Sequence, residues 1–94
     1  MPTYYMFGSY TAEAVEAISA KRTARAVDII KGCGGQLNAM HALLGQHDVV
    51  VVAELPDARA AVRASIELNR LTGITFATAE AIPVEELDRV LENA

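Results

Sequence analysis

Four consecutive valines at positions 49–52 constrain the fold of this chain more than any other feature. They open the segment VVVVAEL, which lies between a Gly-Gln-His-Asp run at residues 45–48 and Pro56-Asp57. β-branched residues favour strands, and clusters of Gly, Asp and Pro mark the turns at strand ends. A strand with one face in water alternates apolar and polar side chains, and this segment does not. The sequence therefore predicts a strand that is covered on both faces.

The rest of the chain predicts three more strands and three helices. Thr11 and Pro83 are typical of helix starts, and Gly73 is typical of a helix end. Arg22 would fall on the apolar stripe of the first helix, so we expect that helix to kink near residues 19–23. The expected strands are residues 3–10, 36–44, 49–55 and 74–81, and the expected helices are residues 12–31, residues 57–71 and a short C-terminal helix in which Val84, Leu87 and Leu91 face inward.

This order, βαββαβ plus a short C-terminal helix, predicts an α+β fold. Right-handed crossovers place the first and third strands at the centre of an antiparallel sheet, with both long helices on one face. We expect the first strand to present Tyr4, Met6, Gly8 and Tyr10 on the other face. An apolar sheet face of this kind favours association. We therefore expect one domain, residues 1–94, that pairs with a second copy through its open sheet face as a dimeric α/β barrel.

The composition supports the expected homodimer. Of the 94 residues, 52% are hydrophobic and only 21% are charged. A domain of this size buries only about 60–65% of the surface of its unfolded chain, so its own core is thin. The apolar content exceeds what such a core can hide, and a partner is expected to cover part of it.

Three features resemble the GYD domain family, a dimeric α/β-barrel group of ferredoxin-like fold. They are the opening strand that ends at Tyr10-Thr11, the helix end at Gly34-Gly35, and the hairpin with Gly45 and Asp48 before the valine run. The family is named for a Gly-Tyr-Asp signature at this hairpin, and His47 stands here at the position of the tyrosine. The resemblance implies the fold and the dimer, and it implies no catalytic residues.

We expect a cytoplasmic protein without membrane span, cofactor or nucleic-acid partner. No apolar run approaches the roughly 18 residues of a membrane helix, and the start Met-Pro-Thr is unlike a secretory signal. The net charge is −4 and the longest basic run is Lys21-Arg22, whereas phosphate contacts need clustered cations. The single cysteine, Cys33, cannot form an internal disulfide; we interpret it as a small buried residue at a helix end, with a reactive thiol as the alternative.

His41 is the candidate catalytic residue. Its strand phase matches Leu37, Ala39 and Leu43, so the direction of that face decides its role. Facing the helices, His41 is an ordinary core histidine; facing a dimer cavity, it can transfer protons near neutral pH. A metal shared with His47 is not expected, because the two histidines are roughly 13–16 Å apart along the hairpin at strand spacing.

The candidate ligand-binding residues are side chains near the expected cavity. Hydroxyl and amide groups among methionines suit a small apolar or aromatic molecule, unless these side chains simply fill a dimer interface. His47 and Asp48 are also expected to form the hairpin turn, with the Asp48 carboxylate accepting a hydrogen bond from its own backbone. The candidates are Tyr4, Tyr10, Asn38, Met40, His47 and Asp48.

The sequence leaves three hypotheses for function open. The first is a binding domain whose dimer cavity holds a small, mostly apolar molecule. The second is a cofactor-independent enzyme, similar to oxygenases or isomerases built on comparable barrels, with His41 as the base and Tyr10 or Asn38 positioning the substrate. The third is a purely structural dimer. A cavity-facing His41 would favour the first two over the third.

Overall fold

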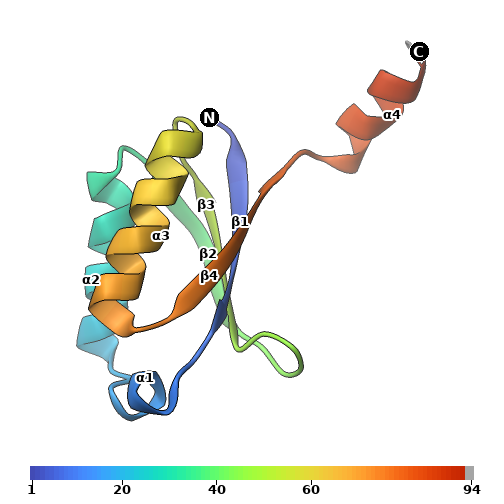
Figure 1. Cartoon of the computed structure of the whole chain (residues 1–94). Helices are drawn as coiled ribbons and strands as arrows, with labels where there is room; N and C mark the ends of the chain where they lie inside the picture. Colours follow the sequence, from blue (N-terminus) through green and yellow to red (C-terminus); the bar gives the residue numbers. More distant parts are fainter. Residues whose placement is uncertain (93–94) are drawn as a thin grey trace.

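The computed structural model describes residues 1–92, which form one antiparallel sheet and a set of helices. Asn93 and Ala94, the end of the expected domain 1–94, lie outside the described residues. Sheet order is β2-β3-β1-β4, which confirms the predicted central pair and the ferredoxin-like α+β fold. Helices α2 and α3 lie side by side on one face of the sheet (Figure 1). The elements are β1 (Thr3–Ser9), α1 (Ala12–Glu16), α2 (Ala20–Gly32), β2 (Gln36–Ala42), β3 (Val49–Glu54), α3 (Ala58–Thr72), β4 (Thr75–Ala81) and α4 (Val84–Glu92).

The expected kink in the first helix is a full break between α1 and α2. Ser19 caps α2, and its hydroxyl oxygen accepts a hydrogen bond from the backbone N–H of Arg22 at 3.0 Å. The Arg22 guanidinium donates to the carbonyl oxygen of Ala14 at 2.7 Å. The arginine that would have interrupted the apolar stripe therefore ties α1 to α2.

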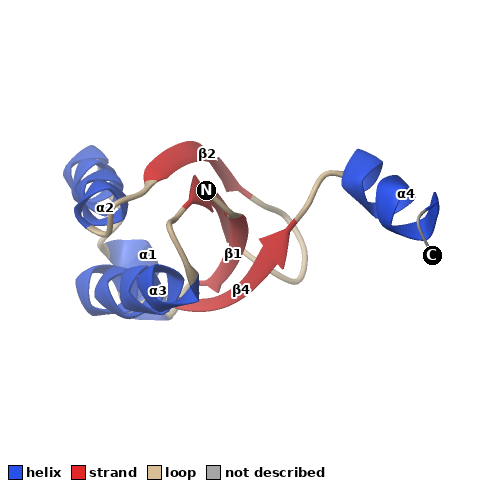
Figure 2. Cartoon of the chain, turned by 90° about the horizontal axis from the view of Figure 1, so that it is seen from above, coloured by secondary structure: helices blue, strands red, loops and turns tan. Residues whose placement is uncertain are grey.

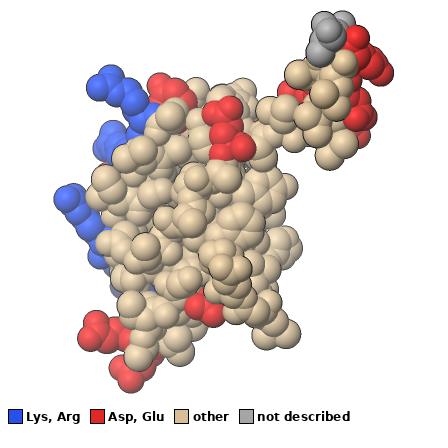
Figure 3. All heavy atoms as spheres, turned by 45° about the vertical axis from the view of Figure 1, so that its right-hand side comes forward, with Lys and Arg blue, Asp and Glu red and all other residues tan. Residues whose placement is uncertain are grey.

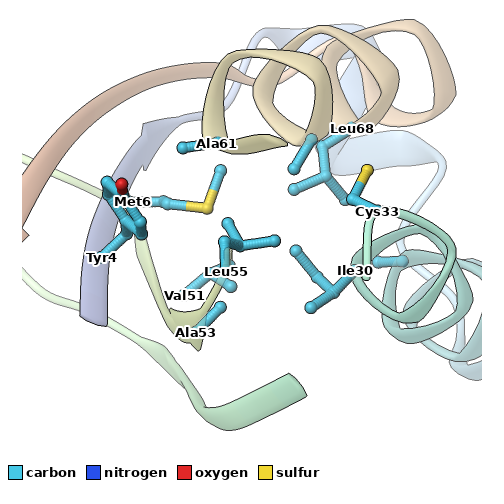
Figure 4. Packing of buried hydrophobic residues seen from close by; sticks show 11 residues of the cluster. Tyr4, Met6, Ile30, Cys33, Val51, Ala53, Leu55, Ala61 and Leu68 are labelled. Carbon is cyan, nitrogen blue, oxygen red and sulfur yellow. The ribbon is translucent and has the colours of Figure 1, made fainter. Parts of the chain in front are cut away.

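The face of β1 that packs under the helices is the opposite of the one predicted. Tyr4 is 4% exposed and Met6 is fully buried, and both belong to the main core with Ile30 of α2 and Leu68 of α3. Figure 4 shows the Met6 side chain pointing into this cluster. The prediction that this face is open was wrong because β1 is apolar on both sides, so alternation paired its residues without showing which set faces the helices.

Gly8 shows why the core face of β1 was hard to recognise. It is buried, like Tyr4 and Met6 of the same strand, and a Cβ at this position would lie 2.6 Å from Cγ2 of Ile74 and 2.8 Å from Cγ1 of Val49. Neighbouring side chains thus occupy the space that a larger residue would need. A glycine at a buried, closely packed position carries no hydrophobic signal in the sequence.

The valine strand divides between the two sides of the sheet, and within the described chain only one of these sides is covered by helices. Val49 and Val51 pack toward the helices, and Val50 lies on the other side, opposite Phe7 of β1. Val50 is only 8% exposed. Strands β1 and β2 lie on either side of β3 in the sheet, so they already cover much of the β3 backbone and the Cβ ends of its side chains.

Helix α4 leaves the rest of the domain. Figure 2 shows it on the side of the sheet away from α2 and α3, and each of its residues is exposed, including Val84, Leu87 and Leu91. The radius of gyration is 14.4 Å, against about 12 Å for a compact chain of this length. The prediction that these three residues face inward was wrong, because no surface of the same described chain meets them. Of the described helices, none is long and apolar enough to cross a membrane.

Candidate functional site

The side of the sheet away from α2 and α3, which we call the open face, is apolar. Antiparallel partners lie on the same side of a sheet, so the strand register defines two rows of side chains. Figure 3 shows a broad surface with few charged groups beside α4. The first row is His41, Val50, Phe7 and Ala77, and the second is Ala39, Val52, Tyr5 and Ala79.

The two aromatic side chains of β1 form the centre of the open face. The rings of Tyr5 and Phe7 stack with centroids 6.4 Å apart and an interplanar angle of 26°, and Tyr5 is 39% exposed. A sheet face in water usually carries polar side chains at such positions. The sequence placed Tyr5 and Phe7 together on one side of the strand, and the error was only in which side is covered.

His41 lies on the open face and is exposed. A β-bulge between Leu37 and Ala39 leaves Asn38 without a partner in the register, and such an extra residue reverses the phase of the strand. Leu37 therefore packs against the core, whereas Ala39 and His41 point to the other side. The expectation that Leu37 and His41 share a face was wrong, and so was the alternative that His41 is a core residue.

The hairpin between β2 and β3 brings the second histidine to the same face. The ring of His47 lies 5.2 Å from the ring of Phe7, with an interplanar angle of 36°. Its Nδ1 atom is buried and has no hydrogen-bond partner among residues 1–92. A buried imidazole nitrogen without a partner is costly unless something else satisfies it. His47 thus extends the first row through its contact with Phe7 and holds a buried, unpartnered nitrogen beside it.

Asp48 fixes the hairpin to the end of β1. Its carboxylate oxygen Oδ2 accepts a hydrogen bond from the backbone N–H of Tyr10 at 2.8 Å, rather than from its own turn as expected. Its backbone N–H donates to the carbonyl oxygen of Gly8, and its carbonyl oxygen accepts from the N–H of Leu43, both at 2.8 Å. These three bonds hold the hairpin in place, so Asp48 positions the neighbouring His47.

Three of the predicted ligand-binding residues do not lie on the open face. Tyr4 is in the core, and its hydroxyl donates to Oε1 of Glu80 at 3.2 Å; burial first, and this bond second, raise the pKa of Tyr4. Tyr10 and Met40 line a cavity of about 50 Å³ between the sheet and the helices. Ligand pockets are typically about 300–1,000 Å³, so this cavity is too small for most ligands. Tyr4 was predicted on the open face because the wrong side of β1 was assigned to the helices.

Cys33 and metal chemistry add nothing to this site. Cys33 is buried at the end of α2, and its thiol donates to Oε2 of Glu67 at 3.6 Å. Burial first, and the bond to Glu67 second, raise the pKa of the Cys33 thiol, which keeps it protonated at neutral pH. Within residues 1–92, no three His, Cys, Asp or Glu side chains gather closely enough to hold a metal ion.

The sheet order and the packing of α2 and α3 on one face of the sheet define an α+β domain of ferredoxin-like fold. Residues 4–91 match the family model of the GYD domain, so the chain belongs to the GYD domain family. A search of curated proteins found no match.

Among solved structures, the fold is similar to the crystal structure of the leucine response regulatory protein of Mycobacterium tuberculosis. The TM-score is 0.58 at 7% sequence identity, over 87% of this chain and 51% of that one. This chain therefore spans about half the length of the other protein. At such low identity the likeness concerns the fold alone.

Proposed function

We propose that this chain forms a homodimer through its open face and holds a small, mostly apolar molecule between the two sheets. The observation that carries the proposal is the open face itself, with its two apolar rows around Tyr5 and Phe7. Large exposed apolar patches mark interaction or ligand sites. Two sheets that pack face to face lie about 10 Å apart, which leaves room for a flat molecule wherever the facing side chains are small.

The small side chains of the outer strands define where such room exists. Ala39 stands at the β2 end of the second row, and Ala77 and Ala79 stand at the β4 ends of the two rows. The aromatic rings of Tyr5 and Phe7 fill the centre of the open face. The alanine side chains at its edges are shorter, so they leave room for a ligand between the two sheets. An aromatic ligand could stack on Phe7 or Tyr5, since offset aromatic pairs are favourable.

His41 and His47 supply the polar groups of the proposed site. Both belong to the first row, one directly and one through its contact with Phe7. Binding pockets are mostly apolar with a few polar atoms that fix orientation. The buried Nδ1 of His47 suits a ligand hydroxyl or carbonyl group, and the exposed His41 suits a second polar atom. We retain these two histidines as binding residues, with Asp48 as the residue that positions the hairpin.

Native mass spectrometry of the protein purified directly from its source tests the proposal. We expect a dimer that carries a retained small molecule, and weaker retention in His41→Ala and His47→Ala. Lys21→Ala is the matched control, because Lys21 is an exposed residue of α2, on the helix side. A dimer that carries no molecule, and that takes up none from a panel of aromatic and aliphatic compounds, would instead support a structural dimer and contradict the proposal.

A cofactor-independent enzyme is the second candidate, because His41 is exposed on the open face. An imidazole in a closed, apolar cavity can accept a proton from a bound substrate near neutral pH. Once a bound molecule is known, His41→Gln separates the two functions. Loss of turnover with retained affinity would support the enzyme, and unchanged conversion of the molecule, or none by the wild type, would exclude His41 as a base.

A further inference from the structure

Helix α4 carries an apolar stripe that nothing in the described chain covers. Val84, Leu87, Val90 and Leu91 are each 48–68% exposed, and at 100° per residue they fall on one side of the helix. A helix of nine residues is only marginally stable in water by itself. The stripe therefore needs a surface to pack against, and the charges around it indicate which one.

The borders of the α4 stripe are acidic. Asp88 and Glu92 follow one edge of the stripe and Glu86 follows the other, while Arg89 lies on the far side of the helix. Figure 3 shows these acidic groups gathered on α4. An apolar stripe between carboxylates fits an apolar surface bordered by cations, and it does not suit an anionic membrane surface.

The outer surface of α3 has this complementary pattern. Val62 and Ile66 are 58% and 47% exposed, and Arg59, Arg63 and Arg70 lie beside them at helical spacing on a shallow groove. Only the Arg63 guanidinium has a carboxylate partner, Glu67 at 3.4 Å, among the described residues. The two other arginines are thus available for carboxylates from outside.

The groove continues from α3 toward the edge strand β4. Val62 and Ile66 also line a second hollow, whose floor is formed by Phe76 and Thr78 of β4. This hollow is mostly apolar, although Glu80 stands at one end of it. A short helix that lay along α3 would therefore bury its apolar stripe over Val62 and Ile66 and place its acidic border beside the arginines.

The α4 helix of the same chain is poorly placed to occupy this groove. Figure 1 shows α4 extending beyond the end of β4, and α3 lies on the other side of the sheet. Only Ile82 and Pro83 connect β4 to α4, and two residues span at most about 7 Å. Pro83 also restricts the backbone at this point. A second copy of the chain supplies the same helix without this constraint.

We propose that α4 is an exchanged arm, which packs its Val84, Leu87 and Leu91 stripe on Val62 and Ile66 of α3 in a second copy. A two-fold axis would make the contact twice, since each chain offers both an arm and a groove. The proposal shares the premise of a homodimer with the proposed function, but it depends on different residues. Sheet pairing and arm exchange can therefore fail separately.

Disulfide trapping between two differently tagged chains tests the exchange. One chain carries Leu87→Cys and the other Ile66→Cys, and the buried, protonated Cys33 is retained in both. On mixing and mild oxidation we expect a disulfide between the two chains. Arg89→Cys is the matched control, because Arg89 is on the opposite side of α4 and should give at least tenfold less of the product.

A chain that carries both Leu87→Cys and Ile66→Cys identifies the occupant of the groove. At low protein concentration, a fast disulfide within one chain would overturn the proposal in favour of an arm that folds back. Absence of any disulfide in the mixture, with an intact dimer by sedimentation, would overturn the arm while leaving the proposed sheet dimer in place. A trapped disulfide in a protein that binds no small molecule would support the arm and contradict only the proposed function.

Charge reversal gives a second, independent measurement. Arg59→Glu and Glu86→Arg both alter exposed residues, so the fold should be retained. We expect either variant alone to raise the dimer dissociation constant severalfold, and a mixture of the two to recover part of the loss. Leu87→Glu should raise it by at least tenfold, because a leucine side chain loses its burial. Unchanged dissociation constants in all three variants would overturn the proposal.

Discussion

The substitution Met6→Ala tests which face of β1 belongs to the core. Met6 is fully buried, with 0% of its surface exposed, and the change removes its Cγ, Sδ and Cε atoms. Such a deletion costs the transfer free energy of the atoms and the energy of the remaining cavity, together about 2–5 kcal/mol. In a domain of this size 1 kcal/mol corresponds to about 4–8 °C in Tm. A loss of about 3 kcal/mol would therefore lower Tm by about 12–24 °C.

The matched control for Met6→Ala is Phe7→Ala, one residue further along the same strand but on the open face. Thermal unfolding of both variants should be followed at protein concentrations that differ a hundredfold. The decrease in Tm for Met6→Ala should be the same at each concentration, because the lost packing lies within one chain. The decrease for Phe7→Ala should vary with concentration if a second copy covers Phe7, since association stabilises the folded state by mass action.

A specific result would refute this assignment of faces. If Met6→Ala cost less than about 1 kcal/mol and its main effect were to dissociate a dimer, Met6 would lie at an interface and not in the core. Phe7→Ala would then carry the large, concentration-independent loss of an emptied core position. The face predicted from the sequence would be the correct one, and both functions proposed for the open face would fail with it.

Three further predictions concern stability. Gly8→Ala should lower the free energy of unfolding by about 1–3 kcal/mol in urea titrations, because its methyl group would meet packed side chains; Gly32→Ala, with no atom within 4 Å of the new methyl group, should be neutral or stabilise by up to about 1 kcal/mol. Burial raises the pKa of Cys33 in the folded state, so as the pH rises the unfolded chain loses the thiol proton first. The free energy of unfolding should therefore be unaffected below the ordinary thiol pKa of 9.0 and decrease as the pH rises above it. Cys33→Ala should make this decrease with pH smaller, and an unchanged slope in the variant would contradict the prediction. Asp57→Ala should cost about 0.5–2 kcal/mol by removing the N-cap of α3, whereas Asp57→Asn should retain most of the stability in the same titration.

The element order and the sheet topology could be predicted because strong local signals coincide with simple chain rules. The valine run marks β3, and Thr11 and Gly73 cap helices where expected. Right-handed crossovers then leave few arrangements for two long helices and four strands. The break at Ser19 was also predictable, since Arg22 could not remain on an apolar stripe.

The faces of the strands could not be predicted from the same signals. Alternation groups residues into two sets, but when both sets are apolar, as in β1, packing against the helices decides between them. In β2 a single bulge at Asn38 moves His41 to the other side of the sheet, and the sequence QLNAMHA has no Gly or Pro to mark it. The sequence therefore offered His41 as a candidate, but it did not predict the side of the sheet on which His41 lies.

The position of α4 shows a third kind of limit, because its partner surface is absent from its own fold. Amphipathic spacing correctly predicts that Val84, Leu87 and Leu91 share one side of a helix. It does not predict whether they pack against the core of the same chain or against another molecule. Exposed apolar side chains thus lie on the open face, on this stripe and on α3, among other places. The open face and the stripe project to the same side of the sheet (Figure 2), whereas the α3 groove lies on the other side, so an arm that reaches this groove in a second copy passes the edge strand β4 of that copy. If the acidic borders of α4 guide it to the arginines of α3, raising the salt concentration should weaken the arm contact first and leave the uncharged rows of the sheet paired.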